Sequence, residues 1–319
     1  MRLKLVPKNT SWNFFSRSKV WIGLSIVLVV LSLISFFVQS LNFGIDFRGG
    51  TSIRTESSEP INVAAYRSAL SSLDLGDITI SEVFDPSFEA DQNVAMIRIQ
   101  AQPGQEAATS ILVENSLQNL KGVSEDIKFV SVESVGPKVS GELIKTAIIA
   151  VILAISAVLF YIWIRFEWQF AVGAISALIH DVILTIGIFS LLQIKFDLAI
   201  IAAILTIVGY SLNDTVVVFD RVRENLRKFK KRSLIEVMNL SINETMSRTV
   251  MTSVTTLLAL ISLFVLGGDV IRGFVFAMIW GVVVGTYSSI FIASAILLWT
   301  GVKRDWTKPN AEAGTQVPK

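Results

Sequence analysis

The sequence of 319 residues contains no cysteine and only one histidine, His180. The lack of cysteine excludes disulfides, thiolate metal ligands and cysteine nucleophiles. A single histidine argues against a conventional zinc site, and we expect no metal and no other cofactor. Charge is also scarce, because 17% of the residues are charged, against about a quarter in soluble domains.

The charge balance excludes further classes of protein. A formal net charge of +2 is too small to indicate a nucleic-acid-binding protein, so we expect no nucleic acid partner. The glycine-containing segment Gly44–Thr51 lacks the Gly-Lys-Ser/Thr ending of a phosphate-binding loop. What the sequence has in quantity is apolar residues, which make up 52% of it. This composition is typical of a membrane protein.

Six stretches are long and apolar enough to cross a hydrocarbon core of roughly 30 Å, which takes about 20 residues of helix. We therefore predict a polytopic α-helical membrane protein. The first stretch has a basic front like that of a signal peptide, but its apolar run is too long and no cleavage site follows, so we expect it to remain as an anchor. The predicted spans are 20–38, 146–164, 170–192, 198–218, 245–266 and 274–299.

The orientation follows from the lysines and arginines beside the spans, because cytoplasmic flanks carry the excess. One set of loops is poor in them, with only Lys195 and Arg272. The termini 1–19 and 300–319 are therefore predicted to be cytoplasmic, and 39–145 to lie outside the inner membrane, in the periplasm. The other flanks are rich in basic residues, namely Arg165, Arg221, Arg223, Arg227, Lys228, Lys230, Lys231, Arg232, Lys303 and Arg304.

The segment 39–145 is long enough to fold as a small domain. Alternating apolar residues predict strands, and apolar residues at helical spacing predict helices. The order strand, helix, strand, strand, helix, strand is that of the ferredoxin-like α+β fold. The predicted elements are 51–56, 62–73, 77–84, 93–101, 106–120 and 126–135.

The segment 219–244 between the fourth and fifth spans is basic at first and then amphipathic. Apolar residues such as Val237, Met238 and Ile242 alternate with polar ones, which favours a helix. Two interpretations stay open. The helix either lies in the membrane interface or connects two spans while packed on the bundle.

Two charged side chains inside the spans stand out, because an ionisable residue there costs roughly 2.5 to 3.5 kcal/mol on insertion scales. Asp214 lies near the end of the fourth span and Arg248 near the start of the fifth, so both lie at similar depth. Paired with Arg248, the carboxylate is stabilised as an anion; with Arg248 moved away, desolvation favours proton uptake. We interpret the two as a proton-transport pair, and a static ion pair that fixes helix packing is the alternative.

Other polar residues in the spans admit two interpretations. His180 and Asp181 in the third span are either a local polar pair or a step in a proton relay. Asn213 would only solvate its neighbour. The fifth span is rich in hydroxyl groups, including Thr252 and Ser253, which either line a water chain or pack helices closely.

Several segments resemble one family. Val208–Asn225, with the sequence VGYSLNDTVVVFDRVREN, is similar to the signature of the SecF branch of the SecD/SecF family of protein-export membrane proteins. Three further segments agree with it, namely GIDFRGGT at Gly44–Thr51, VGPK at Val135–Lys138 and NETMSRT at Asn243–Thr249. His180-Asp181 also fits the family's third span.

The family motif after the first span contains Gly44, Asp46, Arg48, Gly49 and Gly50. One interpretation is a turn that feeds the first strand, with Gly49 and Gly50 permitting positive φ. The other is a contact between the domain and the membrane core. Asp46 and Arg48 could also simply pair with each other.

The resemblance implies a proton-driven machine of the resistance-nodulation-division superfamily, in which Asp214 and Arg248 match the proton-pathway positions. It implies SecD as a heterodimeric partner, association with the SecYEG channel, and YajC and YidC as further candidates. The substrate is then an unfolded preprotein, and ATP hydrolysis belongs to SecA, so this chain is not an enzyme.

Two rival functions are weighed against this one. A small-molecule or lipid exporter of the same superfamily is disfavoured, because such pumps usually carry two large outer domains and about twice as many spans. An assembly factor that stabilises SecD and the channel without transporting anything stays open.

Overall fold

The structure is a computed structural model, and it describes residues 10–73, 75–76, 78–83, 88, 92–100, 106–118 and 127–302. Three sequence predictions lie outside these residues. They are most of the basic N-terminal flank, the turn around Asp85 and Pro86, and the tail after residue 302.

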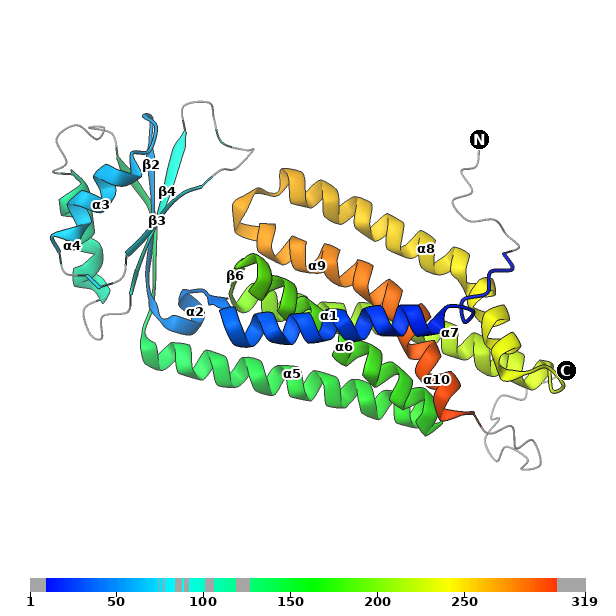
Figure 1. Cartoon of the computed structure of the whole chain (residues 1–319). Helices are drawn as coiled ribbons and strands as arrows, with labels where there is room; N and C mark the ends of the chain where they lie inside the picture. The colour runs from blue at the N-terminus through cyan, green and yellow to red at the C-terminus, as the bar shows by residue number, and fades with distance from the viewer. Residues whose placement is uncertain are drawn as a thin grey trace, which may run out of the picture.

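Within the described residues, six helical segments are long and apolar enough to cross a membrane, which confirms the predicted six. They form a bundle of long helices, with the α+β domain at one end of it (Figure 1). The last segment is a single run of α-helix, π-helix and α-helix. The segments are α1 (Ser18–Gln39), α5 (Pro137–Arg165), α6 (Trp168–Leu192), α7 (Leu198–Lys228), α8 (Leu234–Leu266), and α9 (Gly268–Ser288) with η1 (Ser289–Ala293) and α10 (Ser294–Thr300).

The segment 219–244 is mostly helix. α7 continues to Lys228, and α8 begins at Leu234 with a capping box in which Ser233 and Glu236 bond to each other's backbone. The amphipathic stretch is therefore the first part of α8, with no break before the predicted fifth span. Its apolar residues Val237, Met238 and Ile242 are buried against the bundle, so the packed interpretation is the one that the structure shows.

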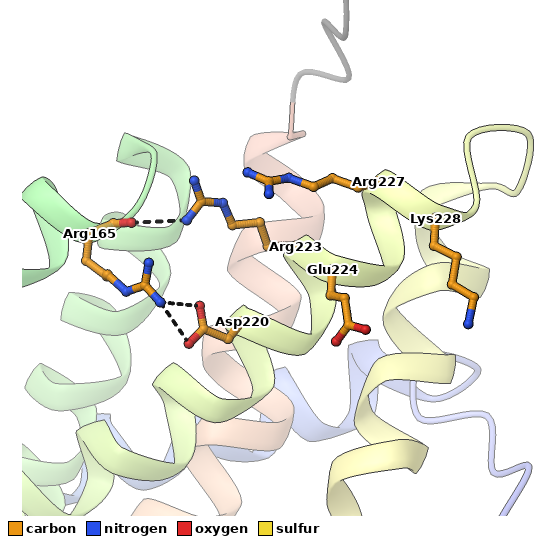
Figure 2. Close-up of a pocket in the computed structure, with 6 residues that line it drawn as sticks. All are labelled: Arg165, Asp220, Arg223, Glu224, Arg227 and Lys228. Carbon is orange, nitrogen blue, oxygen red and sulfur yellow. Dashed lines mark hydrogen bonds and ion pairs between the residues drawn. The ribbon is translucent and has the colours of Figure 1, made fainter. Parts of the chain in front are cut away.

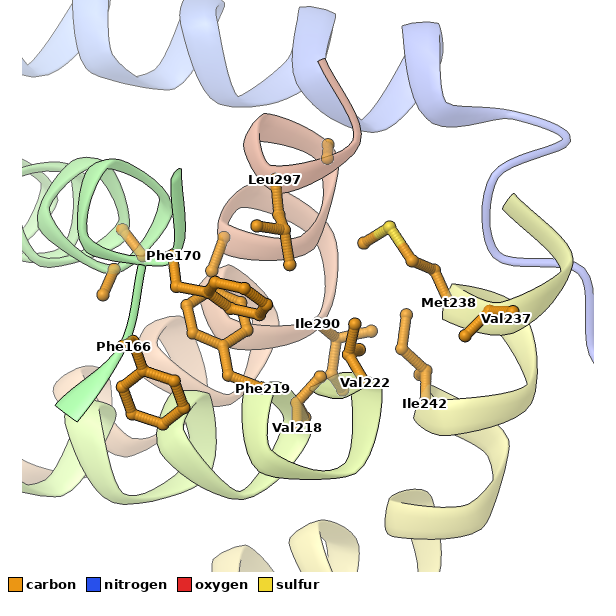
Figure 3. Close-up of a cluster of buried hydrophobic side chains, with 14 of the residues drawn as sticks. Phe166, Phe170, Val218, Phe219, Val222, Val237, Met238, Ile242, Ile290 and Leu297 are labelled. Carbon is orange, nitrogen blue, oxygen red and sulfur yellow. The ribbon is translucent and has the colours of Figure 1, made fainter. Parts of the chain in front are cut away.

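Apolar side chains cover the outside of the bundle. At the end away from the domain, aromatic and aliphatic side chains pack into a buried cluster. α1 and α5 leave most of their apolar side chains exposed, as helices in lipid do. In this buried cluster the Phe170 and Phe219 rings pack edge to face, with their centroids 5.2 Å apart. Figure 3 shows that this cluster joins α6, α7, α8 and the last segment; it includes Phe166, Val218, Val222, Val237, Met238, Ile242, Ile290 and Leu297.

The α+β domain contains a four-stranded antiparallel sheet in the order β3-β4-β2-β5. Helices α3 and α4 lie on one side of it (Figure 1). Ile53 of β2, Ile97 of β4 and Leu70 of α3 are fully buried between the two layers. The elements are β2 (Gly50–Ser57), α3 (Val63–Ser71), β3 (Ile78–Val83), β4 (Asn93–Gln100), α4 (Glu106–Gln118) and β5 (Lys128–Val135).

A short junction connects the domain to the bundle. After α1, strand β1 (Asn42–Phe43) pairs in parallel with β6 (Lys195–Phe196), which lies in the connection between α6 and α7. The single turn α2 (Ile45–Arg48) then leads into β2. The two-residue pairing therefore holds the end of α1 beside the start of α7.

Candidate functional site

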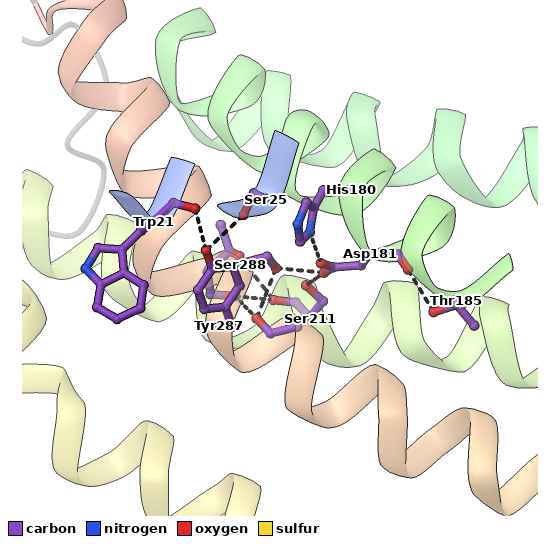
Figure 4. Close-up of polar contacts among 11 residues, drawn as sticks. Trp21, Ser25, His180, Asp181, Thr185, Ser211, Tyr287 and Ser288 are labelled. Carbon is purple, nitrogen blue, oxygen red and sulfur yellow. Dashed lines mark hydrogen bonds and ion pairs between the residues drawn. The ribbon is translucent and has the colours of Figure 1, made fainter. Parts of the chain in front are cut away.

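The carboxylate of Asp181 is buried at the centre of the bundle, and both of its oxygens have polar contacts. The Oδ2 atom of Asp181 on α6 accepts hydrogen bonds from Ser211 Oγ on α7 at 2.6 Å and from Ser288 Oγ on α9 at 2.8 Å. Its Oδ1 atom lies 3.0 Å from His180 Nδ1. Asp181 therefore joins three helix segments (Figure 4).

The polar network continues toward α1. Tyr287 Oη donates to the carbonyl of Trp21 at 2.8 Å and lies 2.9 Å from Ser25 Oγ. The Tyr287 ring lies 6.1 Å from the His180 ring, and His180 Nε2 is buried without a hydrogen-bond partner. A buried polar atom without a partner calls for a functional or structural explanation. His180 thus has one occupied and one unoccupied nitrogen.

Asp214 is the second buried carboxylate, one helical turn beyond Ser211 on α7. Its side chain is 3% exposed, and its Oδ2 atom is buried without a hydrogen-bond partner. Arg248 on α8 lies close enough to interact with it electrostatically, but within the described residues no ion pair joins the two. Arg248 itself is exposed on the surface of the chain. Asp214 and Arg248 are therefore neighbours without a direct ion pair between them.

The hydroxyl groups of α8 mostly bond within the protein. Thr252 Oγ1 donates to the backbone carbonyls of Arg248 and Thr249 in its own helix. Ser253 Oγ lies 2.7 Å from Thr286 Oγ1 and so links α8 to α9. Of these two residues, therefore, Ser253 contacts a neighbouring helix and Thr252 bonds to the backbone of its own. Asn213 is exposed on α7.

Sequence reasoning missed the serines that complete this core. Ser211 and Thr215 lie on the same face of α7 as Asp214, and that spacing was a usable signal. Ser288 and Ser289 gave none, because small hydroxyl residues are common in membrane helices. Ser289 Oγ lies 2.8 Å from Thr215 Oγ1 at the start of the π-helix η1. Such π-turns occur frequently at functional sites.

The glycine motif after α1 contacts the outer end of α7. Gly49 and Gly50 have φ of 73° and 135°, which favour glycine, and they feed directly into β2. Asp46 Oδ2 accepts a hydrogen bond from the N–H of Leu198 at 3.0 Å. Asp46 thus binds the first residue of α7, and in the described part of the chain it forms no ion pair with Arg48. The motif is both a turn and a contact.

The two buried carboxylates of this core differ in their partners. Among the described residues no group of three or more His, Cys, Asp or Glu side chains could hold a metal ion. Both carboxylate oxygens of Asp181 have polar contacts, whereas Asp214 has a buried oxygen without a hydrogen-bond partner. A carboxylate with a nearby but separate counter-ion can exist in two states.

The six membrane helices, the α+β domain and the buried carboxylates define a polytopic helical membrane protein with a polar core. Residues 115–303 match the family described as protein export membrane protein SecD/SecF, C-terminal, and residues 34–61 match the SecD/SecF GG motif. A protein translocase subunit SecF from Cereibacter sphaeroides is 59% identical over 315 residues, which cover 99% of this chain and 97% of that one. The chain therefore belongs to the SecD/SecF family, as one of its SecF translocase subunits.

More distant relatives agree. Translocase subunits SecF from Rhodobacter capsulatus and Vibrio alginolyticus are 57% and 41% identical, over 97% and 93% of this chain and 95% and 92% of theirs. The crystal structure of SecDF from Thermus thermophilus, a translocon-associated membrane protein, is similar with a TM-score of 0.80 and 34% identity. The match covers 94% of this chain but 40% of that SecDF chain. The predicted family is thereby confirmed.

Proposed function

We propose that this chain uses the proton motive force to promote preprotein export across the inner membrane after insertion driven by SecA. Asp214 takes up and releases the proton, and Arg248 is its counter-ion. The observation that supports the proposal is that Asp214 Oδ2 is buried without a hydrogen-bond partner, while the nearby Arg248 forms no ion pair with it in the described chain. An unpaired buried carboxylate is costly as an anion, so either a proton or a movement of Arg248 relieves it.

Movement of α7 couples this event to the α+β domain. α7 runs unbroken from Leu198 to the polar core, so Asp214 lies about 24 Å from the start of its own helix at 1.5 Å per residue. Asp46 holds that start, and the chain passes from Asp46 through Gly49 and Gly50 into β2. A shift of α7 against α6 and α8 therefore reaches the domain through a single short junction.

The domain faces the periplasm in this proposal, and both termini are cytoplasmic. The basic flanks predicted this orientation, and the domain lies at one end of the bundle, away from the α7–α8 connection (Figure 1). We propose a ferredoxin-like fold for this domain, and the strand order β3-β4-β2-β5 with its two helices supports that proposal. In this proposal, movement of the α+β domain pulls on, or releases, an unfolded preprotein that emerges from the channel.

A partner subunit covers the outer face of α7 and α8. Arg248 and Asn213 are exposed on membrane helices, and a charged side chain facing lipid costs roughly 2.5 to 3.5 kcal/mol. We propose SecD as this partner, because the similar solved structures are of SecDF and most of that chain has no counterpart here. SecYEG, and with it YajC and YidC, are the wider assembly.

The test is preprotein translocation into inverted vesicles that carry Asp214→Asn, with and without a proton gradient. We expect gradient-stimulated export to be lost while expression and copurification of SecD are unchanged, because the amide keeps the shape and removes the titration. Asp197→Asn is the matched control, since asparagine is an equally good helix N-cap at the other end of α7. Unchanged export in Asp214→Asn would leave Asp214 a structural residue and favour the assembly-factor function.

A further inference from the structure

A charged hollow of about 540 Å³ lies at the end of the bundle opposite the α+β domain. Its lining comes from the end of α5 and the last two turns of α7 (Figure 2). Four of its side chains are cationic and two are anionic. They are Arg165, Arg223, Arg227 and Lys228, with Asp220 and Glu224.

Both anionic groups of the hollow already have cationic partners. Asp220 lies 3.4 Å from Arg165, and Glu224 lies 2.6 Å from Arg221, which is outside the hollow. Arg223 donates one hydrogen bond to the carbonyl of Arg165 at 3.4 Å. Within the described chain neither Arg223 nor Arg227 forms an ion pair. The hollow therefore presents uncompensated guanidinium groups.

Exposed aromatic residues place the hollow at the level of the lipid headgroups. Tyr161 and Trp163 near the end of α5 are 50% and 66% exposed, and Trp168 at the start of α6 is 58% exposed. Tyr and Trp gather at the boundary between hydrocarbon and water, where one part of the ring system stays apolar and another is hydrated. Arg165 lies between these aromatic residues in the sequence and lines the hollow. The part of the chain that supplies Arg165 to the hollow therefore also carries exposed aromatic residues of the kind found at the membrane boundary.

We propose that this hollow binds the phosphate of an anionic membrane lipid, with Arg223 and Arg227 as the principal donors. The two residues are four positions apart on α7, so they project from the same face of the helix, as Figure 2 shows. Guanidinium groups donate paired hydrogen bonds to phosphate oxygens, which a hydrated ammonium does less well. The adjoining apolar aromatic surface favours a phosphate that carries acyl chains over a free anion. This site is independent of the proposed proton coupling.

The experiment uses the full chain in phosphatidylcholine nanodiscs to which phosphatidylglycerol is added, with bound lipid counted by native mass spectrometry. A guanidinium that bonds directly to the lipid phosphate is expected to contribute about fivefold to binding, and a lysine without such a bond much less. We expect Arg223→Gln with Arg227→Gln to weaken phosphatidylglycerol binding about 25-fold. The matched control is Lys230→Gln with Lys231→Gln, which removes the same charge from the adjoining loop outside the hollow and leaves binding within about twofold. Arg227→Gln alone changes an exposed residue, should not affect folding, and is expected to weaken binding about fivefold.

Three results would overturn the proposal. If Lys230→Gln with Lys231→Gln weakened phosphatidylglycerol binding as much as the double arginine variant, the lipid would be attracted by the overall positive charge of this end of the bundle and not by the hollow. Undiminished lipid binding in folded Arg227→Gln and in the double variant would leave the hollow to another occupant, such as an acidic protein segment, which a photo-cross-linker at position 227 would capture. Displacement of the lipid by an equal concentration of inorganic phosphate would show a free-anion site.

Discussion

Two buried aspartates in neighbouring helices have opposite environments. Asp181 receives hydrogen bonds from Ser211 and Ser288 and contacts His180, so both of its oxygens are occupied. Asp214, one turn beyond Ser211, has a buried oxygen with no partner. Burial is nearly the same, at 1% and 3% exposed. The two carboxylates therefore differ in their hydrogen-bond partners and not in their burial, and only Asp181 joins neighbouring helices through its side chain.

The largest expected effect is on stability, in the pair Asp181→Leu and Asp214→Leu. Removing Asp181 leaves Ser211 without its acceptor, Ser288 with the Gly285 carbonyl alone, and His180 without its contact, so we expect a loss of about 3 to 5 kcal/mol of unfolding free energy. Removing Asp214 deletes a buried group that is already unpaired, so stability should stay within about 1 kcal/mol of the original or rise. Unfolding of the purified chain in detergent measures both.

Equal losses of unfolding free energy in Asp181→Leu and Asp214→Leu would contradict the difference between the two aspartates. That result would mean that Asp214 has a strong partner in the folded chain, and that it fixes packing as Asp181 does.

A smaller effect is expected from the donors to Asp181. Ser211→Ala and Ser288→Ala should each lose about 1.5 to 3 kcal/mol, the usual worth of a hydrogen bond to a charged group. Ser262→Ala is the matched control, because Ser262 is exposed and donates only to the Leu258 carbonyl of its own helix. If both core variants behaved like the control, Asp181 would not depend on these serines.

The smallest stability effect is expected at the junction. Asp46→Ala and Asp197→Ala should each cost about 1 kcal/mol, because each removes an acceptor at the start of α7. Of these two residues, only Asp46 lies in the segment that leads into the domain, so only Asp46→Ala should also lower gradient-stimulated export, by several fold. Equal export in the two variants would show that the junction does not transmit the movement of α7.

The elements of the α+β domain could be predicted from the sequence, and so could the two acids of the core. The predicted strand 51–56 corresponds to β2, Gly50–Ser57, because alternating burial is a local property of one strand. Asp181 and Asp214 were visible because a charge in an apolar run is conspicuous. The length of α8 was not predicted, because its first turns are polar on one side and pack on a surface formed by other helices.

The remaining features depend on contacts between distant parts of the chain. The pairing of β1 with β6 joins two residues on each side and has no local signal. Likewise, Asp46 bonds to Leu198, far along the chain, where a local pairing with Arg48 was the simpler expectation. Ser288 resembles any small residue of an apolar helix until the fold places it beside Asp181.

The uninterrupted length of α7 gives it the properties of a lever. If it pivots as a rigid rod near Asp214, a tilt of about 5° displaces its far end, about 24 Å away, by roughly 2 Å. The hydrogen bond between Asp46 and the Leu198 N–H is 3.0 Å long, and such a bond is lost beyond about 3.5 Å. A rotation too small to repack the bundle is therefore large enough either to break this bond or to carry Asp46 and the adjoining strand with it.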